Sequence, residues 1–199
     1  MDVGTAMGAG WSSGISVYGV VALVGFAGRF GWIGAPSFVE QWWVISVAVV
    51  MFLVEFVIDK IALVDTAWDA VHTLIRPAVG GYLMSTATDT QWSVLALAVS
   101  GVLLALSSHS AKASTRLLVN TSPEPVSNVA VSLGEDGLVF VVMAIAISRP
   151  ELAIVVVALL TVASVVVAFV FYRIARRVAR RLRSGTRTAT ARGLRHDDS

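Results

Sequence analysis

The segment 54–77 places seven ionisable side chains directly after an apolar run that extends from Trp43 to Leu53. An ionised side chain at the centre of a bilayer costs about 2.5–3.5 kcal/mol on insertion scales, so these groups cannot all face lipid. They must pair with one another, hold protons, bind an ion or lie in a hydrated cavity. The seven residues are Glu55, Asp59, Lys60, Asp65, Asp69, His72 and Arg76.

The whole chain is far more apolar than a soluble domain. Its 199 residues are 56% hydrophobic and 14% charged, whereas soluble domains carry about 25% charged residues. We therefore expect an all-α fold, a polytopic membrane helical bundle that forms one membrane domain over residues 1–172. The chain contains no cysteine, which excludes disulfides, thiolate metal sites and iron–sulfur clusters.

Apolar runs and turn residues divide this domain into six predicted helices. Gly10 and Gly14 form a GxxxG pair in the first helix, which predicts close packing against other helices. Pro77 and the two glycines that follow it weaken the third, which is expected to be a tilted span, a broken helix or a re-entrant segment. The predicted helices are at about 11–30, 41–63, 65–84, 92–119, 126–148 and 152–172.

This division predicts five or six transmembrane helices, depending on whether the third one crosses the bilayer. Trp32, Trp42 and Trp43 flank the loop after the first helix and are expected to form an aromatic belt at one interface. The halves 1–84 and 91–182 could be diverged repeats of three helices each.

The positive charge of the chain is confined to its C-terminal end. Residues 1–172 contain six Lys or Arg against eleven Asp or Glu, whereas residues 173–199 contain nine Arg against two Asp. A basic cluster directly after a span predicts a cytoplasmic C-terminus, and it attracts anionic lipid by about 1 kcal/mol per residue. We expect a basic amphipathic juxtamembrane helix at 173–183 that binds anionic lipid and not nucleic acid, followed by a disordered tail at 184–199. The arginines of this helix are Arg173, Arg176, Arg177, Arg180, Arg181 and Arg183.

Charged residues recur at helical spacing in other predicted helices. The third helix carries a 4-3-4 stripe from Asp65 to Arg76 on one face, and the fourth carries Lys112 and Arg116. No single helix has enough opposite charge to neutralise its own acids, so we expect the helices to converge on one partly hydrated site near the cytoplasmic half. The candidate residues are Glu55, Asp59, Lys60, Asp65, Asp69, His72, Arg76, Lys112, Arg116, Glu135 and Asp136.

Acids outnumber bases in this set, and a bound proton or cation would relieve that imbalance in a low dielectric. No cofactor motif is evident, and oxygen ligands favour a hard cation such as Na⁺, Mg²⁺, Ca²⁺ or Mn²⁺. His72 and His109 are each expected to be hydrogen-bonded packing residues and not ligands.

Acidic residues at membrane depth are typical of cation- or proton-coupled transporters and channels, which is the function that the sequence favours. The alternative is a structural or partner-binding membrane subunit held by a buried ion-pair network. An intramembrane metal-dependent lipid enzyme has weaker support, and no enzymatic activity is assigned. The lipid bilayer is the expected partner, and a homo-oligomer is compatible with the sequence.

Several of these charged residues belong to short motifs. The motifs are Glu55-x-x-x-Asp59-Lys60, Val64-Asp65-x-x-Trp68-Asp69, Arg76-Pro77, Ser122-Pro123-Glu124-Pro125 and Glu135-Asp136. Together they resemble an uncharacterised family of bacterial integral membrane proteins that is catalogued only as a domain of unknown function. The resemblance covers Trp11 to about Arg181 and implies a multi-pass protein of the bacterial plasma membrane. It implies no activity.

Overall fold

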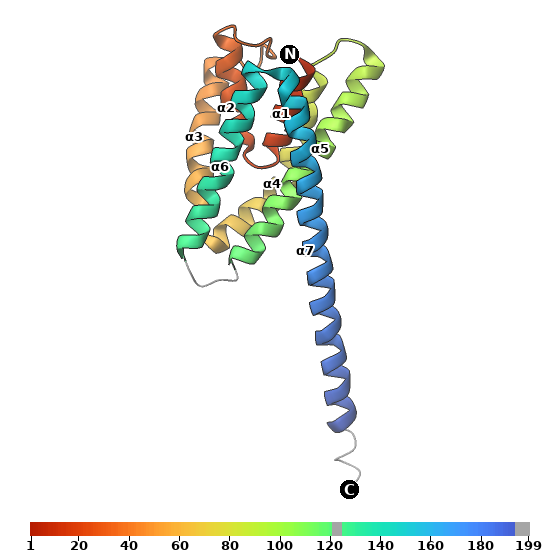
Figure 1. Cartoon of the computed structure of the whole chain (residues 1–199). Coiled ribbons are helices and arrows are strands. Elements are labelled where there is room, and N and C mark those ends of the chain that lie inside the picture. Colours follow the sequence, from red (N-terminus) through yellow and green to blue (C-terminus); the bar gives the residue numbers. More distant parts are fainter. Residues whose placement is uncertain (121–124, 194–199) are drawn as a thin grey trace.

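The computed structural model describes residues 1–120 and 125–193, except for the side chains of residues 62, 63, 120, 125, 178, 179 and 181–193. The regular secondary structure in this part of the chain is helical, which confirms the predicted all-α class (Figure 1). The helices are α1 (Val3–Ser13), α2 (Val17–Arg29), α3 (Trp42–Ile58), α4 (Ala62–Ser85), α5 (Gln91–Asn120), α6 (Pro125–Ser148) and α7 (Pro150–Gly193).

The first predicted helix, at 11–30, is wrong, because this part of the chain forms two short helices joined by a turn. The N–H groups of Gly14 and Ile15 donate to the carbonyl oxygens of Trp11 and Ser12 at 3.2 and 3.0 Å, which tightens the last turn of α1. Serine and glycine are poor residues for a helix interior. The apolar periodicity continues on both sides of the break, so periodicity alone could not reveal it.

These two helices form a buried hairpin, which we call the α1–α2 hairpin (residues 3–29). At 1.5 Å per residue its arms of 11 and 13 residues extend only about 16 and 20 Å, less than the roughly 30 Å hydrocarbon core of a bilayer. The N-terminus and the loop after α2 lie at the same end of the bundle (Figure 1). α1 packs against α4, α5, α6 and α7. In a membrane this hairpin would enter and leave on one side.

The second and third predicted helices are present as α3 and α4. α3 ends at Ile58, earlier than predicted, because the chain turns at residues 59–61. Of the alternatives for the third helix, the structure excludes the broken helix, since α4 continues through Pro77; the tilted span and the re-entrant segment stay predictions. The tight packing of α4 on α5 overrides the local effect of proline. A Cβ atom on Gly101 of α5 would overlap the carbonyl oxygen of Gly80.

Three of the described helices are long and apolar enough to cross a membrane, over Gln91–Val119, Val126–Ser148 and Pro150–Arg177. Two shorter apolar helices, Val17–Arg29 and Trp42–Ile58, accompany them. The chain therefore has the helices of a membrane protein. The number of five or six spans stays a prediction.

The faces of α4 are the reverse of those of a helix in a soluble protein. The charged stripe from Asp65 to Arg76 points into the bundle, with no member more than 5% exposed. The apolar residues on the other side, among them Val71 at 64%, are exposed. A contiguous exposed apolar surface is unfavourable in water and favourable in lipid. The predicted stripe is thus confirmed, and its orientation suits a bilayer. The exposed apolar residues of this side are Ile61, Val64, Val71 and Ile75.

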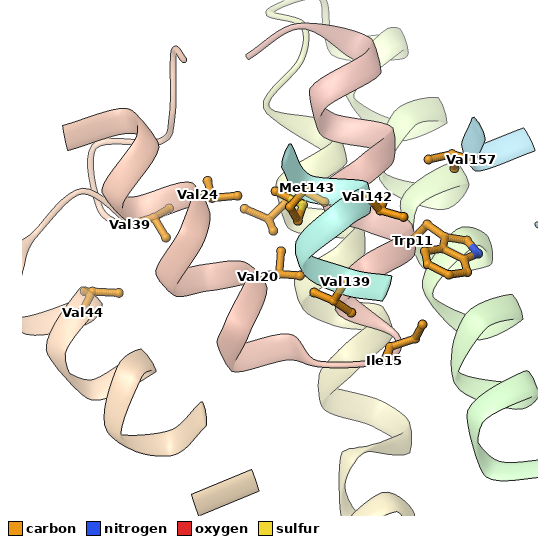
Figure 2. Packing of buried hydrophobic residues seen from close by; sticks show 12 residues of the cluster. Trp11, Ile15, Val20, Val24, Val39, Val44, Val139, Val142, Met143 and Val157 are labelled. Carbon is orange, nitrogen blue, oxygen red and sulfur yellow. The ribbon is translucent and has the colours of Figure 1, made fainter. Parts of the chain in front are cut away.

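Apolar side chains of α1, α2, α3, α6 and α7 form one buried core (Figure 2). Val20 and Val24 of α2 meet Val139 and Met143 of α6 there, and none of the four is more than 1% exposed. This core holds the α1–α2 hairpin in place. The three tryptophans of the predicted aromatic belt, Trp32, Trp42 and Trp43, are exposed.

The helix α7 continues to Gly193, into the tail that was predicted to be disordered. Lengthening an existing helix is easier than starting one. Residues 194–199 lie outside the described part of the chain. The internal repeat stays a prediction: two short helices precede α3 and α4, whereas one long helix, α5, precedes α6 and α7.

Candidate functional site

Most of the predicted site residues meet in one network, which we call the charged cluster. Its members come from α3, the turn after it, α4, α5 and α6, and all are largely buried. Partners that are in contact lie up to 57 residues apart in the sequence, as Asp59 and Arg116 do. The charged cluster consists of Glu55, Asp59, Asp65, Asp69, Arg76, Lys112, Arg116 and Glu135.

Arg76 connects carboxylates of two helices. Its Nη2 donates to Oε1 of Glu55 at 2.8 Å, and its Nη1 donates to Oδ1 of Asp69 at 2.7 Å. The other oxygen of Glu55, Oε2, accepts from the hydroxyl of Ser16 at 2.8 Å, directly before α2. The guanidinium is fully buried, so removing it would leave two carboxylates without their cation.

Lys112 connects α5 to the turn after α3 and to the α1–α2 hairpin. Its Nζ donates to Oδ2 of Asp59 at 2.7 Å and to the carbonyl oxygen of Ile15 at 3.1 Å. Ile15 lies just beyond the C-terminus of α1, where backbone carbonyls lack intrahelical partners. An ammonium group has three N–H bonds, so these two acceptors leave one of them for another contact.

Arg116 is the branch point of the charged cluster. Its Nε and Nη2 donate to Oε2 of Glu135 at 3.0 and 2.6 Å, and its Nη1 donates to the carbonyl oxygen of Asp59 at 2.7 Å and to Oδ1 of Asn128 at 2.9 Å. Oδ2 of Asp65 is 3.8 Å from Nη1. One arginine thus joins the turn after α3 with α4 and α6.

His109 extends this network as a neutral ring. Arginine can only donate, so Nδ1 of His109, 2.9 Å from Nη1 of Arg76, accepts and carries no proton. Its proton therefore lies on Nε2, which donates to the hydroxyl of Thr73 at 3.1 Å. That hydroxyl donates in turn to the carbonyl oxygen of Asp69 at 3.0 Å.

His72 lies to one side of the ion pairs. Its Nδ1 donates to the carbonyl oxygen of Trp68 at 2.8 Å, and its Nε2 accepts from the hydroxyl of Tyr18 at 2.9 Å. Its ring packs against both aromatic side chains. These contacts agree with the packing role that was expected for it.

Besides His72, two candidate residues make no ion pair among those described. Lys60 donates to the carbonyl oxygen of Phe56 at 2.7 Å, and its ammonium lies 3.0 Å from the centre of the Phe56 ring. Asp136 is 7% exposed and its Oδ2 has no hydrogen-bond partner. On α7, the described arginines at 173, 176, 177 and 180 are exposed, and the C-terminal part of this helix extends beyond the bundle (Figure 1). The side chains of Arg181 and Arg183 lie outside the described residues.

Acids exceed bases inside the bundle. The charged cluster together with Asp136 holds six carboxylates against three cationic side chains, Arg76, Lys112 and Arg116. Oδ1 of Asp59 and Oδ2 of Asp69 are buried without a hydrogen-bond partner in the described structure. Such oxygens in a low dielectric require a proton, a water molecule or an ion.

Two hollows reach the charged cluster on different sides of α5. The first, which we call the lateral groove, has a volume of about 310 Å³ and lies between α1, α5, α6 and α7, with Lys112 and Glu135 in its wall. The second, the α4–α5 cavity, has a volume of about 170 Å³ and is lined by Asp69, Thr73, His109 and Arg116 among others. Carboxylates of the cluster therefore border open space in two places.

The carboxylates of the charged cluster pair with three different cationic side chains and do not converge on one point. Among the described residues, no group of three or more Asp, Glu or His side chains is arranged to hold a metal ion.

The structure adds partners that sequence reasoning did not select. Asn128 lies on the same face of α6 as Glu135 and Asp136, so its helical spacing from them could have predicted that it belongs to the site. Ser16 and the carbonyl oxygen of Ile15 depend on the hairpin, which the periodicity did not predict.

Comparison with known proteins identifies the family and leaves the activity open. No curated protein and no solved structure is significantly similar to the chain. One family model matches residues 3–169, and its description is "Domain of unknown function (DUF4126)". The match covers the α1–α2 hairpin, the charged cluster and the first part of α7, and it confirms the resemblance to a family known only as a domain of unknown function. The chain therefore belongs to the DUF4126 family.

Proposed function

We propose that the protein is a small proton- or cation-coupled membrane transporter whose coupling groups are the carboxylates of the charged cluster. The observation that carries this proposal is the excess of buried carboxylates over buried cations beside two hollows. In a low dielectric, six carboxylates around three bases are not stable with every carboxylate ionised and unbalanced. Some of them must hold a proton, or a cation must bind beside them. Exchange of that proton or cation through a hollow is the elementary step of a coupled transporter.

The α1–α2 hairpin supports the same function. Irregular backbone at membrane depth is tolerated where it is buried in protein or lines a cavity, and transporters use such interrupted helices at their binding sites. Here the turn of the hairpin accepts from Lys112 through Ile15 and donates to Glu55 through Ser16. A movement of the hairpin would therefore change the surroundings of two ion pairs, Lys112 with Asp59 and Arg76 with Glu55.

The proton is the coupling ion that we favour. The carboxylates that make short contacts are paired with an arginine or lysine, so only single oxygens such as Oδ2 of Asp69 are left without a partner in the described structure. Among the described residues, no three or more Asp, Glu or His side chains are arranged to hold a metal ion. A single carboxylate oxygen can hold a proton, whereas Na⁺, Mg²⁺, Ca²⁺ and Mn²⁺ need several oxygen ligands. The control is to measure flux into vesicles with a gradient of each of these four cations in place of the pH gradient.

Replacing Glu135 by glutamine is expected to abolish proton flux and to preserve the fold. Glutamine keeps an oxygen that accepts from Arg116, so the free energy of unfolding should change by only about 1 kcal/mol. Loss of a positioned proton-transfer group lowers rates by about 100-fold or more. The measurement is pH-driven proton flux into vesicles containing the purified protein, together with thermal unfolding.

Asp89→Asn is the matched control, since Asp89 is exposed in the loop after α4. It should retain the flux of the unmodified protein. Unchanged flux in Glu135→Gln would contradict the assignment of Glu135 as a coupling group.

A structural or partner-binding subunit is the second candidate function. The observation that favours it is the dense pairing of Arg76, which donates to Glu55, Asp69 and His109 at full burial. Such a network could lock the helices without any exchange of ions. The same vesicle measurement separates the two functions, because a structural subunit predicts no flux in the unmodified protein.

We propose further that the protein resides in a bacterial plasma membrane, with α7 emerging into the cytoplasm and its arginines on anionic lipid. The guanidinium of Arg173 lies 4.7 Å from the centre of the Phe169 ring. An arginine with its stem along apolar side chains and its charged end in the headgroup region is expected at a membrane interface. Changing Arg173, Arg176, Arg177 and Arg180 to glutamine should weaken binding to phosphatidylglycerol vesicles by up to about 700-fold, because each arginine contributes about 1 kcal/mol and each 1.4 kcal/mol is a factor of ten in affinity. A phosphatase fused after Ser199 should be inactive, and an active one would overturn the orientation.

A further inference from the structure

The lateral groove carries a hydrogen-bond donor that no described residue uses. Trp11 lines the groove, is 2% exposed, and its Nε1 has no hydrogen-bond partner. Figure 2 shows its indole pointing away from Val20 and Val24. A buried donor without an acceptor is unfavourable and rare. Trp11 therefore marks a position for an acceptor that comes from outside the chain.

Other polar groups line the same groove. Lys112 has one N–H left after its contacts with Asp59 and Ile15, and Glu135 uses only Oε2 for Arg116, so Oε1 remains as an acceptor. Ser164 of α7 contributes a hydroxyl that is 5% exposed. The groove thus offers donors and one carboxylate oxygen to a small polar head.

Most of the other residues that line the groove are apolar, and some of them are exposed on the outside of the bundle. Its wall includes Leu138 of α6 and Val167 of α7, which are 37% and 43% exposed. Both helices are long and apolar enough to span a membrane. Gly134 also lines the groove, and a Cβ atom placed there would meet nothing within 4 Å. A missing side chain therefore leaves a channel that an acyl chain can occupy.

We infer that the lateral groove binds a single-chain amphiphile with a carboxylic acid head, a fatty acid, which enters from the bilayer. The carbonyl oxygen of the head accepts from Trp11 and Lys112, and its O–H donates to Glu135. The volume of about 310 Å³ is at the small end of ligand sites and suits one head with the first part of one chain. This inference names the substrate class of the proposed transporter and rests on that function for the claim that the bound acid is moved.

The test is photolabelling of the full-length purified protein in detergent with a diazirine-bearing palmitic acid. We expect labelling of peptides that contain residues 131–138 and 160–167. Gly134→Phe should reduce this labelling at least fivefold, because its ring fills the groove. Gly137→Phe is the matched control: Gly137 is equally open, lies on the same helix and does not line the groove. Equal labelling of the two variants would overturn the inference.

A second variant tests the head group. Trp11→Phe keeps an aromatic ring at this position and removes the indole N–H, so labelling by the acid should fall about three- to tenfold, the equivalent of one hydrogen bond. Labelling by a diazirine alkane of equal length should not change. An equal effect on both probes, or none on the acid, would overturn the assignment of the head. If labelling behaves as expected while Glu135→Gln leaves proton flux intact, the binding site stands and the proposed coupling fails.

Discussion

Arg76→Met should destabilise the protein by about 3–5 kcal/mol, the usual effect of removing one partner from a buried ion pair. Arg76 is fully buried and holds Glu55 and Asp69 at 2.8 and 2.7 Å, so both carboxylates would lose their cation inside the bundle. For a chain of this length the expected fall in the melting temperature is about 6–20 °C. Thermal unfolding of the purified protein in detergent measures it.

Arg149→Met is the control for Arg76→Met, because Arg149 is exposed between α6 and α7. Its effect on the melting temperature should be small. Adding Glu55→Gln and Asp69→Asn to Arg76→Met should recover part of the lost stability, since the uncompensated charges are then gone. A melting temperature of Arg76→Met equal to that of the unmodified protein would mean that water reaches these carboxylates.

Gly14→Val should prevent the α1–α2 hairpin from seating against α5. A Cβ atom at Gly14 would overlap the carbonyl oxygen of Ala105 and the hydroxyl of Ser108. The first of these is backbone and cannot move away without displacing α5. Overpacking of this kind costs about 1–3 kcal/mol and more where backbone is involved. The expected result is a loss of the folded fraction in size-exclusion chromatography and a lower melting temperature.

Gly137→Val separates this effect from a general intolerance of valine in these helices. A Cβ atom at Gly137 meets nothing within 4 Å, so this variant should fold as well as the unmodified protein. Retained stability in Gly14→Val would contradict the close contact between the hairpin turn and α5. The contact matters for function too, because the same turn presents Ile15 to Lys112.

Periodicity and composition were sufficient for the class of the protein and for the polar face of α4. An apolar chain with Asp65, Asp69, His72 and Arg76 at 4-3-4 spacing can place that stripe only toward other helices, because lipid does not solvate charge. The structure buries all four residues. The same reasoning located Lys112 and Arg116 on one face of α5 and required partners for Glu135.

The partners themselves were decided by tertiary structure. Helical spacing specifies which side chains share a face, but it carries no information on which face meets which, so the contact of Arg116 with Asp59, Asn128 and Glu135 could not be derived. The break at Gly14 has the same origin. Local preferences there are weak, and Ala105 and Ser108 of α5 leave room only for a glycine at this turn. Sequence thus specified a buried charged site in a membrane bundle, whereas packing between helices decided the ion pairs and the hairpin that reaches them.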